Sequence, residues 1–123
     1  MAMQATVLVV DDDAGLRQVI QLALEREGYD VATATNGHRA LAHIAAQPPA
    51  LVLLDLHLPV MDGGEVLAQL RAQNLAIPVV LMTSRFTIRA AAVQHQPVGV
   101  LGKPFDLDEL LQVVARFAGG PPA

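Results

Sequence analysis

The sequence predicts an α/β domain in which helices cover both faces of a parallel β-sheet. Two observations lead to this prediction. Short apolar runs rich in Val and Leu alternate along the chain with longer segments whose apolar residues recur every three or four positions. Three of these runs are almost continuously apolar, which is typical of strands buried on both faces. Because consecutive parallel strands are joined by right-handed crossovers, we expect the helices to lie on both sides of the sheet.

The strands are expected at five apolar runs, residues 6–10, 29–34, 50–54, 77–82 and 98–101. The helix after the first run places four apolar residues on one face, Leu16, Val19, Ile20 and Ala23. Gly28 suits the left-handed position that commonly follows a helix, so we expect this helix to end just before it.

The second helix is expected to start at Asn36, whose side chain can accept a hydrogen bond from the first helical turn. It buries Leu41 and Ile44, and it ends before Pro48, which cannot continue a helix. The third helix follows the turn "DGG", and its apolar stripe consists of Val66, Leu67 and Leu70.

The fourth helical segment, within residues 85–98, is short and rich in Ala, and Pro97 is expected to end it. The last helix begins with Asp106 and Glu109 in the spacing of a capping box, in which each side chain bonds the backbone N–H of the other residue. We expect Gly119 to end this helix. Its apolar stripe consists of Leu110, Leu111, Val114 and Phe117.

Length and composition favour one compact domain. The chain has 123 residues, of which 53% are hydrophobic, so a substantial core is possible. We expect the domain to occupy residues 1–118, with "GGPPA" at 119–123 as a tail or the start of a linker. No apolar run approaches the roughly 18 residues of a membrane span, the start "MAMQATVLVV" lacks a signal-peptide pattern, and cysteine is absent. These features predict a cytoplasmic protein without a membrane partner.

Charge and aromatic content argue against direct nucleic-acid binding by this domain. Eight Lys and Arg stand against twelve Asp and Glu, and the chain has no Trp, one Tyr and three Phe. The basic patch that neutralises phosphates and the aromatic side chains that stack on bases are therefore both missing. A dinucleotide site is also disfavoured, because aspartates follow the first strand where that site needs a glycine-rich turn.

Chemically active side chains follow four of the predicted strands at their carboxyl ends. They are Asp11, Asp12 and Asp13, then Asp55, then Thr83 and Ser84, and finally Lys103. In an open parallel sheet the ligand crevice lies at this edge, so we expect these groups to meet. Two carboxylates about 4 Å apart repel by roughly 4 kcal/mol at an effective dielectric of 20, so a cation, a raised pKa or exposure must offset the repulsion. Asp13 has a simpler interpretation as the N-cap of the first helix.

Four motifs together, "VLVVDDD", "LVLLDLHLPVMDGGE", "LMTS" and "GKPF", resemble the receiver domain of two-component response regulators. The resemblance covers essentially the whole chain. It implies a flavodoxin-like (βα)5 fold, a doubly wound parallel sheet with strand order 2-1-3-4-5. It also implies a phosphoacceptor that takes a phosphoryl group from a sensor histidine kinase or a phosphotransfer protein. An output domain or partner protein of unknown identity, and possibly a second copy in a homodimer, would then receive the signal.

The resemblance assigns the acidic residues to two roles. Asp55 matches the phosphoacceptor. Asp11 and Asp12 match the acidic pair that holds Mg²⁺ together with Asp55, and the backbone carbonyl of His57 matches the remaining protein ligand. A bound Mg²⁺ would offset the repulsion among these carboxylates.

The resemblance also assigns roles on the last two strands. Thr83 matches the hydroxyl that bonds the phosphoryl group, and the small Ser84 beside it would leave room for the phosphoryl donor. Lys103 matches the lysine that pairs with the phosphoryl group, and its bond to Pro104 is expected to be cis. A cation, a hydroxyl and a divalent ion are the groups that phosphoryl transfer needs to stabilise its transition state.

The chain departs from the family on the face that relatives use for signalling. Relatives carry Tyr or Phe three residues before the lysine, where this chain has Val100, and the stretch from Thr83 to Lys103 is slightly short. Either the usual aromatic switch is silent here, or Val100 belongs to the core and a neighbouring residue takes over its task. His57 and Arg85 occupy the two positions that tune the lifetime of the phosphoryl group, and their bulk predicts slow hydrolysis.

Two alternatives stay open at this point. Asp11 and Asp13 reproduce the spacing of the catalytic aspartates in haloacid-dehalogenase-like phosphatases, although the chain is short for that fold and "LLDLHLPVMDG" stays unexplained. A degenerate receiver that docks partners without phosphorylation is the second alternative. The receiver interpretation predicts a signalling phosphoacceptor rather than an enzyme, with at most self-catalysed phosphotransfer and autodephosphorylation.

Overall fold

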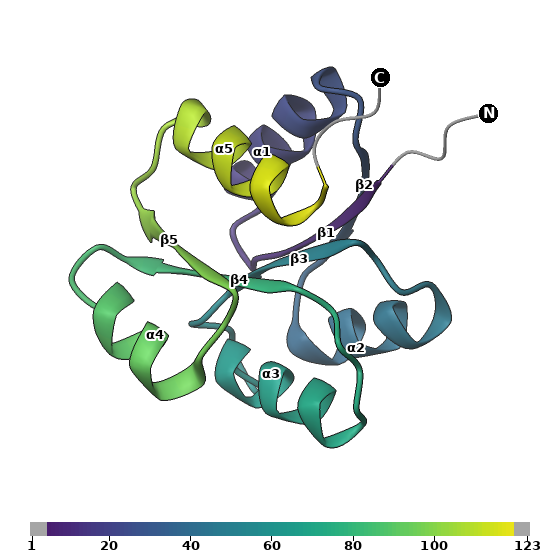
Figure 1. The fold of residues 1–123 in the computed structure, drawn as a ribbon, viewed down its shortest axis with the longest axis vertical. Helices are drawn as coiled ribbons and strands as arrows, with labels where there is room; N and C mark the ends of the chain where they lie inside the picture. Colours follow the sequence, from purple (N-terminus) through teal and green to yellow (C-terminus); the bar gives the residue numbers. More distant parts are fainter. Residues whose placement is uncertain (1–4, 120–123) are drawn as a thin grey trace.

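A parallel sheet lies between two layers of helices in the computed structural model, which describes residues 5–119 (Figure 1). Within those residues, five strands alternate with five helices. The strands are β1 (Thr6–Val10), β2 (Asp30–Ala34), β3 (Leu51–Asp55), β4 (Val79–Ser84) and β5 (Gly99–Lys103). The helices are α1 (Ala14–Arg26), α2 (Gly37–Ala46), α3 (Gly63–Ala72), α4 (Ile88–His95) and α5 (Leu107–Phe117). The predicted α/β class is therefore confirmed.

The strand order is β2-β1-β3-β4-β5, with all neighbouring strands parallel, as the flavodoxin-like arrangement requires. Helices α1 and α5 cover one face of the sheet, and α2, α3 and α4 cover the other (Figure 1). No helix within residues 5–119 is long and apolar enough to cross a membrane. Residues 120–123 of the expected tail lie outside the described part of the chain.

The side chains of the central strands alternate between two halves of the core. In β1, Leu8 belongs to the cluster beneath α2 and α3, whereas Val9 belongs to the cluster beneath α1 and α5. Leu54 and Leu53 of β3 divide in the same way. All four side chains are fully buried. Burial on both faces explains why these strands are continuously apolar in the sequence.

The predicted ends of three strands were too early, because strand pairing continues past the apolar runs. Asp55 pairs with Met82 as the last residue of β3, while Thr83 and Ser84 extend β4. Lys103 pairs with Ser84 at the end of β5. The polar residues of the candidate site are thus fixed by the sheet itself rather than by the loops that follow it.

Asp and Asn side chains cap the N-termini of four described helices. Asp13, Asn36, Asp62 and Asp106 each accept a hydrogen bond from the backbone N–H three residues later. These residues begin α1, α2, α3 and α5, respectively. The predicted capping box at Asp106 is only half formed: Asp106 accepts from the backbone N–H of Glu109, but the side chain of Glu109 bonds Arg85 and not the backbone of Asp106. A complete capping box occurs at the start of α3, between Asp62 and Glu65.

The helix ends follow the predictions closely. Gly28 and Gly119 have φ angles of 93° and 84°, in the left-handed region that glycine tolerates without strain. Helix α4 ends at His95, two residues before Pro97, because Gln96 between them adopts a left-handed conformation with φ of 49°. The guanidinium of Arg71 donates to the carbonyl oxygens at this end of α4, those of residues 95 and 96.

One prediction about burial, that for Val19, is corrected by the structure. Val19 is 53% exposed, because the buried stripe of α1 runs through Ile20 and Leu24 and turns Val19 towards solvent. His43 and His95 are half-buried. The ring of His95 fits there because Gly64, on the first turn of α3, has no side chain.

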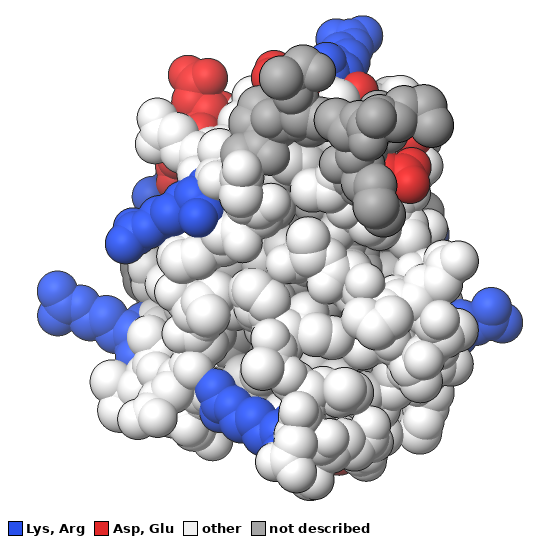
Figure 2. Space-filling view, turned by 45° about the vertical axis from the view of Figure 1, so that its right-hand side comes forward, with Lys and Arg blue, Asp and Glu red and all other residues white. Residues whose placement is uncertain are grey.

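The Lys and Arg side chains visible in Figure 2 are scattered, most of them at the edges of the view. They form no continuous basic patch on the described residues of that face, in keeping with the low basic content of the chain.

Candidate functional site

Three carboxylates meet at the carboxyl ends of β1 and β3. Asp11 and Asp12 follow β1, and Asp55 ends β3, which pairs with β1 along its length. Each side chain offers an oxygen within 4.8 Å of the oxygens of the other two. Asp11 is fully buried and Asp55 is 5% exposed, while Asp12 faces solvent. Three hard oxygen donors in this arrangement suit a divalent cation such as Mg²⁺.

Asp13 stands outside this cluster. Its side chain accepts a hydrogen bond from Leu16 N–H over 3.1 Å at the start of α1, and its own backbone N–H donates to Asp11 Oδ1 over 2.9 Å. The N-cap interpretation is confirmed. Arg17 donates to the backbone carbonyl of Asp11 over 2.7 Å, so both the carboxylate and the carbonyl of Asp11 are held by the first turn of α1.

Lys103, the last residue of the edge strand β5, places a cation next to these carboxylates. Its Nζ lies 2.8 Å from Asp11 Oδ2 and 3.5 Å from Asp55 Oδ2. Burial acts to lower the pKa of Lys103, but the hydrogen bond to Asp11 and the two negative charges outweigh burial and raise this pKa above its ordinary value. Lys103 therefore stays protonated in the site.

The surroundings of Asp55 act on the pKa of its carboxyl group in opposite directions. Burial raises the pKa of its carboxyl, and the negative charge of Asp11 raises it further. The charge of Lys103 and a hydrogen bond from His57 N–H to Asp55 Oδ1, 3.2 Å long, act to lower the pKa, but the net change is upward. This carboxylate is thus poorly solvated and has few compensating charges. The side chain of His57 is exposed.

Thr83 lies on β4, one residue after Met82, which pairs with Asp55 at the end of β3. Its side chain is 1% exposed, and its Oγ1 lies 2.7 Å from Oγ1 of Thr87. Ser84 Oγ lies 3.1 Å from the same Thr87 oxygen. Sequence reasoning missed Thr87. Its position four residues after Thr83, at the start of a helical segment, was the available signal.

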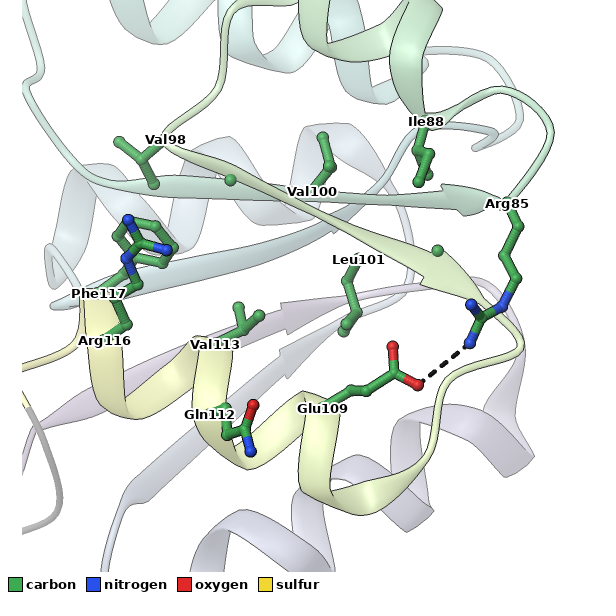
Figure 3. Close-up of a pocket in the computed structure, with 12 residues that line it drawn as sticks. Arg85, Ile88, Val98, Val100, Leu101, Glu109, Gln112, Val113, Arg116 and Phe117 are labelled. Atoms are coloured by element: carbon green, nitrogen blue, oxygen red, sulfur yellow. Dashed lines mark hydrogen bonds and ion pairs between the residues drawn. The ribbon is translucent and has the colours of Figure 1, made fainter.

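Two other predicted positions lie on the face formed by α4, β5 and α5, shown in Figure 3. Arg85 turns towards α5, where its Nε donates to the Pro104 carbonyl over 3.0 Å and its Nη2 pairs with Glu109 Oε1 over 3.1 Å. Val100 is half-buried and packs against the core cluster beneath α2 and α3. Both residues line a surface groove of about 500 Å³. The Lys103–Pro104 peptide bond is cis, as the resemblance implied.

The structure thus brings Asp11, Asp12, Asp55 and Lys103 together, with Thr83 on the adjacent strand. It does not bring Arg85 to this cluster, because that side chain is engaged at the start of α5.

Comparison with known proteins gives one consistent result. A family model described as the response regulator receiver domain matches residues 7–115. The DNA-binding transcriptional regulator NtrC of Salmonella typhimurium is 38% identical over 112 residues, which make up 89% of this chain and 24% of that protein. The sporulation initiation phosphotransferase F of Bacillus subtilis is 34% identical over 118 residues, 94% of each chain. The chain therefore spans about a quarter of the NtrC relative and nearly all of the phosphotransferase.

Solved structures agree with these matches. The receiver domain of NtrX from Brucella abortus has a TM-score of 0.84 at 32% identity, with 92% of this chain and 98% of that chain covered. The chemotaxis response regulator CheY4 of Vibrio cholerae has a TM-score of 0.86 at 30% identity, with 94% and 99% covered.

Proposed function

The chain belongs to the response regulator receiver domain family, and from this premise we propose that Asp55 is its phosphoacceptor. The observation that carries the proposal is the setting of Asp55, a nearly buried carboxylate beside two other aspartates and 3.5 Å from the ammonium group of Lys103. The chain is thus a receiver domain of the two-component type, a signalling phosphoacceptor rather than a classical enzyme. Neither the phosphatase nor the docking-module alternative is favoured.

In the proposed reaction an oxygen of Asp55 forms a bond to the phosphorus atom, while the bond between phosphorus and the donor's histidine nitrogen breaks. The carboxylate must be ionised to attack, and Lys103 and the His57 N–H oppose the effect of burial by favouring that form. Lys103 would then pair with the phosphoryl oxygens, and the Thr83 hydroxyl would donate to one of them. Self-catalysed transfer from a small phosphate donor is part of this proposal.

The residues present fit a magnesium ion. Asp11, Asp12 and Asp55 would hold it through carboxylate oxygens, and the backbone carbonyl of His57 would add a fourth protein oxygen. When bound, Mg²⁺ would neutralise negative charge on the phosphoryl oxygens. The role of the protein is to hold three acidic side chains close together, two of them buried and the third, Asp12, open to solvent.

Intact mass after incubation with acetyl phosphate and Mg²⁺ tests this proposal. We expect the wild type to gain the mass of one phosphoryl group, and Asp55→Asn or added EDTA to prevent the gain. Asp13→Asn is the matched control, because it removes a neighbouring carboxylate outside the cluster while asparagine keeps the helix cap. A gain in Asp55→Asn, or none in the wild type, would contradict the proposal.

The partners of the chain follow from the same premise. A sensor histidine kinase or phosphotransfer protein is the proposed donor, and an output domain or a partner protein is the proposed receiver of the signal. A homodimer and a cytoplasmic location stay predictions.

A further inference from the structure

We propose that Thr87 is a positioning residue that holds the hydroxyl of Thr83 and is released when Thr83 turns to the phosphoryl group. The start of α4 would then report phosphorylation. This inference rests on the proposed function, and it identifies the neighbouring residue that takes over the task of the aromatic side chain replaced by Val100.

In the proposed mechanism, the Thr87 hydroxyl and a phosphoryl oxygen compete as acceptors for the hydroxyl hydrogen of Thr83. Thr87 Oγ1 donates to the backbone carbonyl of Ser84 over 3.2 Å and lies 2.7 Å from Thr83 Oγ1. A hydroxyl has a single hydrogen to donate. The 2.7 Å contact is compatible with either hydroxyl as the donor, and we take Thr83 as the donor because this arrangement lets all the contacts of the Thr87 hydroxyl form together. Thr83 must therefore leave Thr87 before it can donate to a phosphoryl oxygen.

The release of Thr87 has a direct consequence for α4. Thr87 is the N-cap residue of this helix, but its backbone is helical, with φ of −112° and ψ of −4°, and its side chain makes no cap bond within the described residues. In the other helices of residues 5–119 the cap residue is extended and its side chain bonds the first turn. The hydroxyl that would cap α4 is instead engaged with Thr83 and Ser84. Once Thr83 leaves, the first turn of α4, which has no side-chain cap, loses the contact that ties its N-cap residue to β4, so we expect its backbone N–H groups to exchange more freely.

The segment before Thr87 is firmly attached, so that movement of Thr83 acts on Thr87 rather than on the whole loop. Arg85 N–H donates to the Lys103 carbonyl over 3.2 Å, and the Arg85 side chain reaches Glu109 on α5 (Figure 3). Gly102, which pairs with Thr83 across the strands, has no side chain, and a Cβ there would lie 2.9 Å from Arg85 Cγ. The loop therefore rests directly on β5.

The test compares Thr87→Val, which removes the hydroxyl and keeps the shape, with Thr87→Ser, which keeps the hydroxyl. Thr33→Val, at an exposed position on β2, is the matched control. The probe is beryllofluoride with Mg²⁺, a mimic of the phosphoryl group. The readouts are its apparent Kd and the amide hydrogen exchange of residues 88–92 with and without it.

We expect Thr87→Val to tighten beryllofluoride binding about fivefold, the factor that corresponds to one hydrogen bond of ordinary net strength. In this variant the exchange of residues 88–92 should no longer respond to beryllofluoride, whereas the wild type, Thr87→Ser and Thr33→Val should all respond. Wild-type affinity and an unchanged exchange response in Thr87→Val would overturn the inference, as would a Thr87→Ser variant that behaves like Thr87→Val. A wild type that neither binds beryllofluoride nor gains a phosphoryl group would instead contradict the proposed function.

Discussion

Lys103 Nζ donates a hydrogen bond to Asp11 Oδ2 over 2.8 Å and so links the end of β5 to the residue that follows β1. Asp11 is fully buried, while Lys103 is partly open to solvent. Loss of the ammonium group would leave a buried carboxylate without its charged partner, which is costly in free energy. The pair therefore contributes to stability as well as to the chemistry proposed for the site.

We predict that Lys103→Met lowers the free energy of unfolding by about 2 kcal/mol, less than for a completely buried pair because Lys103 is partly solvated. Urea denaturation in EDTA measures the loss, and added Mg²⁺ should reduce it by supplying positive charge. Because the pKa of Lys103 is raised in the folded state, its contribution is complete below the ordinary lysine pKa and is lost only as the pH rises through the raised value. Arg89→Met, an exposed cation on α4, serves as the control. Equal losses in both variants would contradict the prediction.

Asp55→Asn is predicted to stabilise the fold at neutral pH. Burial first, and the charge of Asp11 second, raise the pKa of Asp55 above the ordinary aspartate value of 3.8. Ionised Asp55 therefore costs stability above the raised pKa, and the cost disappears as the pH falls through that value to below 3.8. In EDTA, thermal denaturation should show a higher Tm for the variant at pH 7 to 8, by about 4 °C if the cost is near 1 kcal/mol. A gain that persists unchanged to pH 4 would show that another cause is responsible.

The contact between Gly64 and His95 predicts a coupling between α3 and α4. A Cβ at residue 64 would collide with the His95 ring, so Gly64→Ala should destabilise the wild type by roughly 1 kcal/mol. With His95→Ala in place, the same change should stabilise the fold by up to about 1 kcal/mol, because alanine favours a helix more than glycine does. Urea denaturation of both single variants and the double variant gives the coupling energy. Additive effects would indicate that the ring moves aside freely.

The phosphoryl group on Asp55 is predicted to be long-lived, with a half-life of minutes or more in Mg²⁺. His57 is exposed beside the acceptor, whereas Arg85 is held at α5 by Pro104 and Glu109. His57→Ala should therefore shorten the half-life more than Arg85→Ala does. Following the decay of the phosphorylated mass with time measures both. Decay of the wild type within seconds, or a larger effect at Arg85, would refute the prediction.

The strands and the site clusters were predictable because each strand is a short apolar run that ends at a polar residue. Asp55 and Lys103 could be placed together from the rule that parallel strands meet at one edge. The ends of β3, β4 and β5 could not, because backbone pairing of polar residues leaves no mark on hydropathy. The exposure of Val19 cannot be recognised from the sequence, because an apolar residue at a helical spacing does not reveal the width of the buried face.

The hydrogen bonds of Glu109 and Thr87 could not be predicted for a shared physical reason. In each case a residue outside the local helix-capping pattern competes for the side chain. The side chain of Glu109 bonds Arg85, which lies in the loop after β4, and does not bond the backbone of Asp106 as a capping box requires. The side chain of Thr87 makes no cap bond to α4, because its hydroxyl contacts the hydroxyl of Thr83 at the other end of the same loop. Local patterns favour the local bond in both cases, and only the packed structure decides between the partners.

Mapping the phosphorylated residue tests the central claim most directly. After incubation with acetyl phosphate and Mg²⁺, borohydride reduction converts a phosphoaspartate to homoserine, which peptide mass analysis can locate. The proposed function predicts homoserine at position 55 alone. Homoserine at position 11 or 12, with Asp55 intact, would contradict it.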